Sequence, residues 1–380
     1  MKILYLHSSD INSRMANLHQ VISMCNALAE KNDVYLSLLG NRNLSEISTQ
    51  QLEQIYGKIN FTIGTRQTYF STYGMYFWSK STHSIVNKYK PDLIYCRSQL
   101  YIRLINSYNI PLVFESHDAI LHSRLTWLDK FWKKYIINAS YVNKFFYLVT
   151  ISEALKKFWI STGVNPEIII SLHDGFDTKY FKNELSRTDA RTQLSLDDQK
   201  IIVTYTGSLY KDRGIDYIIN LARDYPDVLF LVVGGPDKQK EYYENFSSNN
   251  GIFNIIFIGQ VPHKMISTYL YSSDILLGLW SNQVRTIQYC SPLKIFEYMA
   301  SGRIIVAQAF PTIKEVLDDK VNAILVEPDS YLDLKEKINY TINNISDICV
   351  GKKARQIAFD NYSWSIRASR VLDFISNSLH

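Results

Sequence analysis

Short apolar runs alternate with longer amphipathic segments along almost the whole chain. In the first half of the chain, the apolar runs predict strands at residues 2–6, 33–39, 92–96, 111–115, 146–151 and 167–172. The segment that follows the first run repeats apolar residues at helical spacing, with one face formed by Leu18, Val21, Met24, Cys25 and Leu28. Strands that alternate with helices in this way predict a parallel sheet covered on both faces.

The alternation stops and then starts again. Residues 183–199 are polar with little apolar pattern, and we expect them to be a linker. Strands are predicted again at residues 200–206, 228–233, 254–258, 274–279, 303–307 and 323–326. The prediction is an α/β chain with two Rossmann-like, doubly wound domains, residues 1–182 and 200–360, that face a central cleft. Ligands are expected at the carboxyl ends of the strands. The helix within 361–380 has an apolar face and is expected to cross back to the first domain.

Composition narrows the class of protein. With 380 residues, 46% of them hydrophobic and 20% charged, the chain is expected to be globular and long enough for two cores. No window approaches the roughly 20 apolar residues of a membrane span, and the first residues lack a signal-peptide layout. The four cysteines have neither metal-site nor disulfide spacing, which predicts reduced thiols in the cytoplasm. The net charge of +5 comes from the first half of the chain, where an anionic partner is one interpretation and a solvated surface is the other.

Residues 291–302, with the sequence SPLKIFEYMASG, hold the most informative pattern. Ser291 and the following proline predict a helix start, and Gly302 predicts its end. Lys294 lies in the first turn, where free N–H groups and the helix dipole favour an anion, and Glu297 follows one turn later on the same side. The pair suits a sugar nucleotide, with the diphosphate at the helix end and the ribose diol on the carboxylate. The alternative is an ordinary amphipathic helix with both side chains in water.

Two loops of the second half could complete such a site. The loop after the strand at 200–206 contains Gly207, Ser208 and Arg213, and a guanidinium before a helix can hold a phosphate with two donors. The segment Gly259-Gln-Val261 follows another strand, where backbone groups could contact a nucleobase edge. Each loop could equally be a solvated turn. Neither matches the phosphate-loop pattern or the Gly-x-Gly-x-x-Gly fingerprint.

The first half offers fewer candidates. His117 and Arg97 each follow a predicted strand, so they could reach a sugar hydroxyl or a developing charge, although a structural role is the alternative for both. Residues 73–80 and 127–146 mix aromatic and basic side chains. Such a mixture suits an interfacial helix on an anionic membrane, and the alternative is a packed helix with exposed lysines.

Together these motifs resemble the GT-B fold glycosyltransferases of family 4, the glycosyl transferases group 1, over nearly the whole chain. The resemblance implies a retaining transferase in which the second domain holds a nucleotide-diphosphate sugar and the first domain holds the acceptor, with no metal and no cofactor. It implies that Arg213 and Lys294 meet the diphosphate, that Glu297 meets the ribose and that His117 faces the donor sugar. The implied catalytic residues are His117, Arg213 and Lys294. The implied donor-binding residues are Gly207, Ser208, Gly259, Val261, Ser291, Leu293 and Glu297, and the acceptor or donor-sugar candidates are Arg14, Asn17, Arg97 and Tyr289.

Three positions depart from the family pattern. Tyr289 stands where the family often has a glutamate that contacts the donor hexose, and Ser208 stands where it has a basic residue. Residues 13–17 replace a glycine-rich loop. The predicted function is transfer of a sugar to a hydroxyl of a glycan or lipid-linked acceptor in bacterial surface polysaccharide assembly, with possible contact to the inner face of the membrane and no nucleic acid partner. The alternatives are a sugar-nucleotide epimerase and a non-catalytic scaffold that binds nucleotide sugars.

Overall fold

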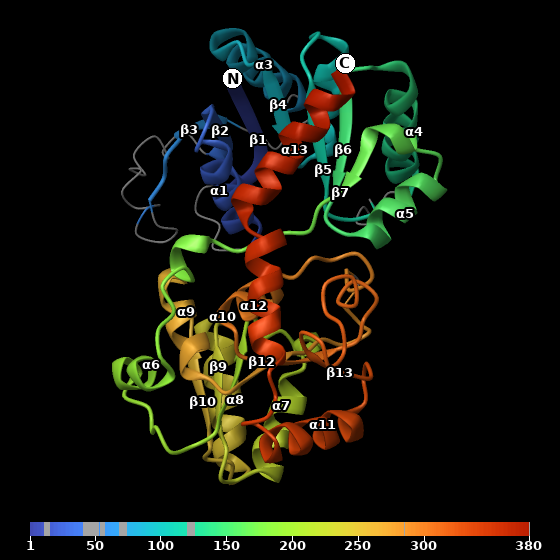
Figure 1. Cartoon of the computed structure of the whole chain (residues 1–380). Helices are drawn as coiled ribbons and strands as arrows, with labels where there is room; N and C mark the ends of the chain where they lie inside the picture. Colours follow the sequence, from blue (N-terminus) through green and yellow to red (C-terminus); the bar gives the residue numbers. More distant parts are fainter. Residues whose placement is uncertain are drawn as a thin grey trace. The chain divides into compact units, whose positions relative to one another are not determined.

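The computed structural model describes residues 1–10, 16–40, 53, 58–67, 74–119, 126–284 and 286–379. The chain divides into two compact units (Figure 1). The first unit contains Met1–His173 together with Trp364–His380, and the second contains Asp174–Ser363. Among the described residues, no helix has both the length and the apolar character that crossing a lipid bilayer requires.

The first unit is built on a parallel sheet of seven strands in the order β3-β2-β1-β4-β5-β6-β7. The strands are β1 (Lys2–Asp10), β2 (Asp33–Gly40), β3 (Thr62–Gln67), β4 (Leu93–Cys96), β5 (Leu112–Ser116), β6 (Phe146–Thr150) and β7 (Ile169–Ser171). Its helices are α1 (Ala16–Leu28), α3 (Gly74–Tyr89), α4 (Thr126–Val142), α5 (Glu153–Ser161) and α13 (Trp364–Leu379), with 3-10 turns η1 (Gln99–Asn106) and η2 (Pro166–Ile168). The order reverses at β1 and β4, so their carboxyl ends form the switch point where such sheets bind ligands.

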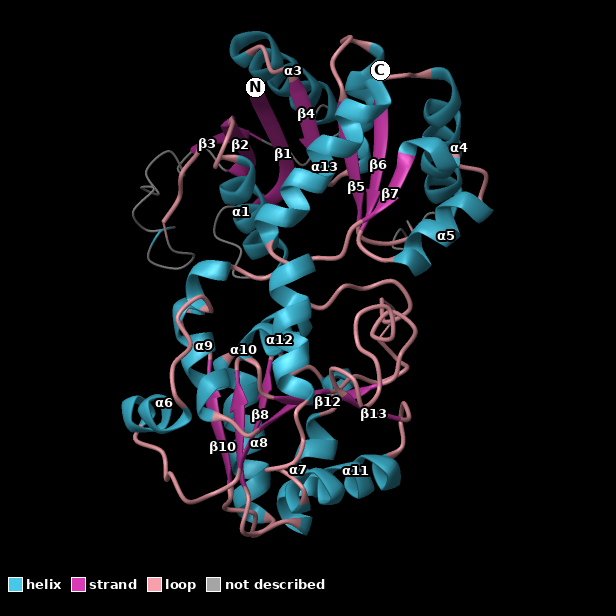
Figure 2. Cartoon of the chain, viewed as in Figure 1, coloured by secondary structure: helices cyan, strands magenta, loops and turns pink. Residues whose placement is uncertain are grey.

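The second unit repeats this plan with six parallel strands in the order β10-β9-β8-β11-β12-β13 (Figure 2). The strands are β8 (Ile202–Thr206), β9 (Leu229–Val233), β10 (Ile255–Gly259), β11 (Ile275–Gly278), β12 (Ile304–Gln308) and β13 (Ile324–Val326). Its helices are α6 (Arg187–Leu194), α7 (Ile215–Asp224), α8 (Asp237–Asn249), α9 (His263–Ser272), α10 (Leu293–Ser301), α11 (Tyr331–Asn343) and α12 (Val350–Asn361), with 3-10 turns η3 (Thr178–Tyr180) and η4 (Lys211–Arg213). Here the switch point lies between β8 and β11.

Both faces of the second sheet are covered, which explains why its strands have near-continuous apolar sequences. Along β11, Ile275 and Leu277 belong to one buried cluster, whereas Leu276 between them belongs to the cluster on the opposite face. Successive side chains of a strand point to opposite faces, so a strand needs an apolar residue at every position when helices cover both. The predicted α/β fold class of two Rossmann-like domains is therefore confirmed.

The C-terminal helix α13 belongs to the first unit although the second unit precedes it in the chain (Figure 1). It packs along α1. Its buried residues Trp364, Arg367, Ala368, Val371 and Ile375 follow helical spacing, so one stripe of the helix faces the core. The arginine in that stripe is part of a polar cluster described below.

The structure differs from the sequence interpretation in the segment expected to be a linker. Residues 183–199 contain helix α6, which lies within the second unit. The buried guanidinium of Arg191 donates to Asp274 at 2.6 Å and to the carbonyl of Ser272 at 2.9 Å. This helix is anchored by a buried ion pair rather than by an apolar face, so hydrophobic periodicity gave no signal.

Strand β3 was not predicted either. Its sequence, TIGTRQ, lacks an apolar run because it is an edge strand that pairs with β2 alone. Edge strands have less buried surface than central ones, so their sequences carry a weaker hydrophobic signal.

Candidate functional site

Helix α10 is positioned by a tyrosine that connects it to two strand ends. The hydroxyl of Tyr298 accepts a hydrogen bond from the backbone N–H of Thr206, at the end of β8, at 2.8 Å. It also lies 3.3 Å from the carbonyl of Leu277 in β11. The helix ends at Ser301, and Gly302 caps it with φ of 73°. The first turn of α10 is therefore held at the switch point of the second sheet.

The helix start differs from the predicted capping. Pro292, and not Ser291, occupies the N-cap position, and α10 begins at Leu293. The hydroxyl of Ser291 accepts a hydrogen bond from the backbone N–H of Asp174 at 2.9 Å. Ser291 therefore fastens the segment before the helix to the start of the second unit.

Lys294 is the most unusual side chain of this region. Its Nζ atom is buried and has no hydrogen-bond partner among the residues that the structure describes. The amine lies 3.8 Å from the ring centroid of Tyr205 and 4.8 Å from that of Trp280. Desolvation holds the pKa of Lys294 well below its usual value, and the positive charge of Arg213 lowers it further. A buried amine is costly without a partner, so an anion at this point would be strongly attracted.

Arg213 lies beside this amine on the η4 turn. The carbonyl of Asp212 accepts a hydrogen bond from the backbone N–H of Ser281 at 3.1 Å, which fastens the turn to the segment after β11. Gly214 follows with φ of 75°, and a Cβ atom there would lie 2.7 Å from Cβ of Leu279. Arg213 is half-buried and forms no ion pair within the described part of the chain. The charge of Arg213 thus acts on the amine of Lys294, and neither cation forms an ion pair with an acidic side chain among the described residues.

The loops around this point approach one another through glycines. A Cβ atom at Gly207 would lie 3.2 Å from Lys294 Nζ, and one at Gly234 would lie 2.3 Å from the carbonyl oxygen of Gly207. The backbone N–H of Gly234 in turn donates to the carbonyl of Gly259 at 2.8 Å. The ends of β8, β9 and β10 are thus drawn together, and the missing side chain at Gly207 leaves room for the amine of Lys294. Ser208, Val261, Leu293 and Tyr289 are half-exposed.

Glu297 has a partner that the sequence interpretation did not identify. Its Oε1 atom lies 2.6 Å from Nε2 of His263, the first residue of α9. Burial by itself lowers the pKa of His263, but the carboxylate of Glu297 raises it, and the net pKa lies above the usual value. The available signal was the position of His263, two residues after the Gly259-Gln-Val261 motif.

In the first unit, Glu115 on β5 is the centre of a buried polar cluster. It accepts hydrogen bonds from the hydroxyl of Tyr95 on β4 and from Arg367 of α13, the latter at 2.8 Å. Its other oxygen lies 2.5 Å from Nε2 of His117 and 3.8 Å from Nε of Arg97. Burial by itself raises the pKa of Glu115, but Arg367, His117 and Arg97 outweigh it and hold the pKa well below its usual value.

The two candidates of this unit, His117 and Arg97, are brought together by this cluster. Nδ1 of His117 lies 2.9 Å from Arg97, which also donates to the carbonyl of Asn17 and the side chain of Gln20, each at 3.0 Å. Arginine can only donate, so Nδ1 accepts and Nε2–H donates to the carboxylate. Both ring nitrogens of His117 are therefore engaged by the protein, and a hydrogen bond from either to a sugar requires an exchange of partners.

The remaining sequence candidates are only partly covered. Arg14 lies outside the described residues, as do the side chains of 73–80. Asn17 is half-buried at the start of α1, and its carbonyl binds Arg97. In α4, Trp127 and Phe131 are exposed, and the guanidinium of Arg103 lies 5.9 Å from the Phe131 ring.

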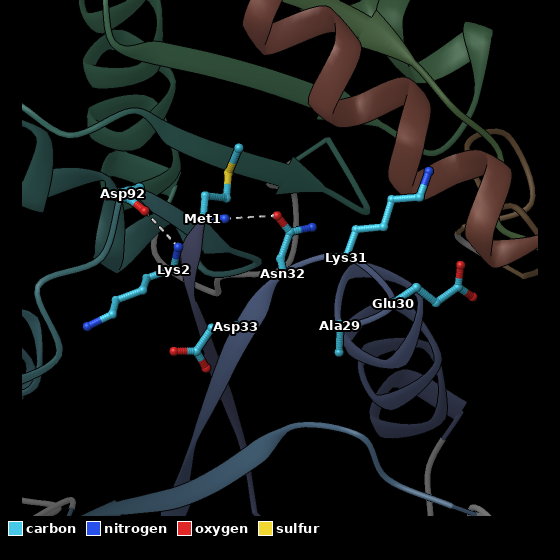
Figure 3. A pocket seen from close by; sticks show the side chains of 8 residues that line it. All are labelled: Met1, Lys2, Ala29, Glu30, Lys31, Asn32, Asp33 and Asp92. Carbon is cyan, nitrogen blue, oxygen red and sulfur yellow. Dashed lines mark hydrogen bonds between the residues drawn. The ribbon is translucent and has the colours of Figure 1, made fainter.

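An open hollow of about 580 Å³ lies in the first unit, at the amino ends of the strands rather than at their carboxyl ends (Figure 3). Met1, Lys2, Asn32, Asp33 and Asp92 are among its lining residues. The amino terminus donates to Asn32 and the backbone N–H of Lys2 donates to Asp92, so its main polar groups are partnered (Figure 3). It lies at the amino ends of β1 and β2, away from the edge where such sheets bind ligands.

Comparison with known proteins agrees with the fold. Residues 186–357 match the family model described as glycosyl transferases group 1. An uncharacterized glycosyltransferase of Methanocaldococcus jannaschii is 27% identical over 57% of this chain and 55% of its own length. The lipopolysaccharide 1,2-N-acetylglucosaminetransferase of Salmonella typhimurium is 24% identical over 60% of this chain and 62% of its own length. The chain thus matches less than two thirds of the length of either relative.

The fold match covers the whole chain. HepE of Anabaena, solved with UDP and with UDP-glucose, is 18% identical and has a TM-score of 0.75 over 99% of this chain and 100% of its own. The resemblance found in the sequence is confirmed. Residues 186–357 are thus similar to the glycosyl transferases group 1, and the chain as a whole has the GT-B fold found in glycosyltransferases such as HepE.

Proposed function

We propose that the protein is a retaining glycosyltransferase that moves a hexose-type sugar from a nucleoside diphosphate to a hydroxyl of its acceptor. The observation that carries this proposal is the buried amine of Lys294, which has no hydrogen-bond partner among the described residues and lies at the start of α10 beside Arg213. A diphosphate is the ligand that suits two convergent cations and free helix N–H groups.

The rest of the nucleotide would follow α10 toward Glu297. Its carboxylate would accept hydrogen bonds from the ribose diol one turn after the phosphate end of the helix. The backbone of Gly259 and Val261 would contact the nucleobase, and Gly207, Ser208, Ser291 and Leu293 would surround the diphosphate. Tyr289 would then lie near the donor sugar, in place of the acidic residue common in this family.

The chemistry depends on charge that develops as the bond from the sugar to the diphosphate breaks. Arg213, Lys294 and the N–H groups of α10 would stabilise this charge more in the transition state than in the bound donor. With retention, the acceptor hydroxyl attacks from the side of the leaving group and passes its proton to a phosphate oxygen of the departing diphosphate. Two protein cations would supply the positive charge at the phosphates, so we propose that transfer requires neither metal ion nor cofactor.

The acceptor would bind to the first unit, where Arg14, Asn17 and Arg97 are the candidate contacts, and His117 remains the catalytic candidate expected to face the donor sugar. A lipid-linked glycan of bacterial surface polysaccharide assembly is the acceptor class that we propose. The similarity to a transferase named for lipopolysaccharide supports it, and so do the exposed Trp127 and Phe131 of α4 beside basic residues. These side chains would contact anionic lipid at the cytoplasmic face of the membrane.

A donor screen tests the proposal. The purified chain is heated with UDP-, GDP-, ADP- and dTDP-sugars, because a bound ligand raises the melting temperature. The donor that shifts the wild type is then incubated with lipid-linked acceptors, and both released nucleotide and the anomeric configuration of the product are measured. Binding, acceptor-dependent release and a retained configuration are expected. Binding without release under any condition would instead favour a scaffold, and conversion of the donor without acceptor would favour an epimerase.

A further inference from the structure

The start of α9 approaches the second turn of α10 through one pair of side chains. Nε2 of His263 lies 2.6 Å from Oε1 of Glu297, and both side chains are largely buried, with 18% and 10% of their surfaces exposed. A carboxylate can only accept at neutral pH, so Nε2 carries the hydrogen and donates it. The contact is a short charge-assisted hydrogen bond, which is stronger than one between neutral groups.

The imidazole is itself held in place. Its ring meets the ring of Tyr180, from the η3 turn, edge to face at a centroid distance of 5.3 Å. Burial lowers the pKa of His263 and the Glu297 carboxylate raises it; Asp177, at the N-cap of the η3 turn, raises it further, and Lys179 opposes that effect. His263 is therefore fixed from one side by an aromatic contact and fastened on the other to the carboxylate.

The hydrogen bond to His263 leaves the second oxygen of the Glu297 carboxylate available to accept hydrogen bonds from a ligand. Oε1 of Glu297 is bonded to His263, whereas Oε2 forms no hydrogen bond within the described part of the chain. A free glutamate side chain has three rotatable bonds, so fixing it in one conformation costs conformational entropy. The hydrogen bond from His263 fixes the side chain before any ligand arrives.

We propose that His263 is a positioning residue for ribose recognition: it holds the Glu297 carboxylate so that Oε2 and the second lone pair of Oε1 accept the two ribose hydroxyls. This inference rests on the proposed function, in which Glu297 meets the ribose. His263 acts through Glu297 and needs no contact with the nucleotide. A 2′-deoxy or 3′-deoxy nucleotide presents one hydroxyl fewer, so it should gain less from this arrangement.

The test compares variants of His263 that separate the role of its hydrogen-bond donor, Nε2–H, from the role of its aromatic ring. His263→Phe keeps an aromatic ring against Tyr180 and removes the hydrogen-bond donor. His263→Gln places an amide N–H at a reach similar to that of Nε2 and is the conservative variant. His263→Asn is polar but too short to reach Oε1, and it serves as a second loss variant if the phenylalanine is poorly accommodated. Melting temperatures without ligand establish that each full-length variant is folded.

The probes are UDP, ADP and GDP with their 2′-deoxy and 3′-deoxy counterparts, measured by calorimetry. Wild type should bind one ribonucleotide tighter than its deoxy forms by about tenfold or more, as expected for a hydrogen bond to a charged group. His263→Phe and His263→Asn should lose most of that preference while binding the deoxy forms almost as wild type does. His263→Gln should retain it. Combining His263→Phe with Glu297→Gln should weaken binding little beyond Glu297→Gln alone.

Two results would overturn the inference while leaving the proposed function intact. One is an unchanged ribose preference in His263→Phe and His263→Asn. The other is an equal loss of affinity for ribo and deoxy nucleotides, which would mean that His263 only maintains the structure. A wild type that binds none of these nucleotides would overturn the proposed function, and the inference with it.

Discussion

Both units place charged side chains near the switch point of a parallel sheet. The two units differ in whether the protein itself supplies hydrogen-bond partners for those charges. In the first unit, the carboxylate of Glu115 meets Arg367 at 2.8 Å and His117 at 2.5 Å, and Tyr95 and Arg97 complete the cluster. In the second unit, the amine of Lys294 is also buried. Among the described residues it has no hydrogen-bond partner and lies over the rings of Tyr205 and Trp280. One cluster is satisfied by the protein itself and the other is not.

This difference indicates which unit is prepared for an anion. A polar cluster that is fully hydrogen-bonded fixes the structure around it, and it gains little from a ligand. A buried cation without a partner costs stability, and evolution retains such strain mainly where function uses it. The cost at Lys294 therefore supports the proposal that a diphosphate completes this site.

The largest change in stability is expected when the hydrogen-bonded cluster around Glu115 loses its negative charge. Glu115→Gln removes the negative charge and leaves the buried guanidinium of Arg367 uncompensated, which costs about 3–5 kcal/mol. At about 2–4 °C per kcal/mol for a unit of this size, the melting temperature of the first unit should fall by about 10 °C. Calorimetry measures this, and Glu167→Gln, an exposed glutamate in the same unit, is the matched control. A fall no larger than that of the control would mean that the cluster is not the anchor of α13.

Removing the unsatisfied charge should have the opposite effect on stability. Lys294→Met keeps the length of the side chain and removes the charge, so the melting temperature without ligand should stay the same or rise. Transfer should fall by about 10²–10³-fold, as for the loss of one oxyanion donor. Lys238→Met, an exposed lysine of α8, is the control for both measurements. A variant that loses stability and activity together would contradict the idea that the cost at Lys294 serves the ligand.

The turn that carries Arg213 can be tested with two glycines of similar conformation. Gly214 has φ of 75° and Gly251 has φ of 70°, but only Gly214 has atoms where a Cβ would be, with Leu279 at 2.7 Å. Gly251→Ala should cost about 1–2 kcal/mol for the left-handed backbone alone. Gly214→Ala should add about 1–3 kcal/mol for the collision and should weaken nucleotide binding, because Arg213 is displaced. Equal losses in denaturant unfolding and unchanged binding would show that the turn does not depend on this close approach.

The smallest change in stability is expected at a partly exposed ion pair whose N–O distance equals that between Arg367 and Glu115. Nζ of Lys335 lies 2.8 Å from Asp224, as close as Arg367 lies to Glu115, but both partners are partly exposed. Hydrogen bonds from Lys335 and Tyr331 lower the pKa of Asp224. Any stabilisation is therefore present above the unfolded pKa of about 3.9 and is lost as the pH falls through the lower folded value. Asp224→Asn should barely change the melting temperature at neutral pH, and a loss comparable to that of Glu115→Gln would contradict the role of burial.

Several elements could be predicted from the sequence because their signal is local. Central strands such as β5, β6 and β11 are buried at every position and largely apolar, since both faces of a covered sheet are removed from water. The edge strand β3 and the polar helix α6 could not be predicted in this way. The first pairs with only one strand, and the second is held by the ion pair between Arg191 and Asp274, whose members are far apart in the chain.

The sequence by itself determined the α/β alternation, the α10 segment with Lys294 and Glu297, and the similarity of residues 186–357 to the glycosyl transferases group 1. These features depend on residue type and short spacing, which a linear pattern contains. Only the tertiary structure decided that His263 holds Glu297, that Arg367 reaches Glu115 and that Lys294 lies buried against Tyr205 and Trp280. The physical reason is that a side chain's charge state and partners depend on desolvation and on neighbours brought from distant parts of the chain, and neither is encoded in local periodicity.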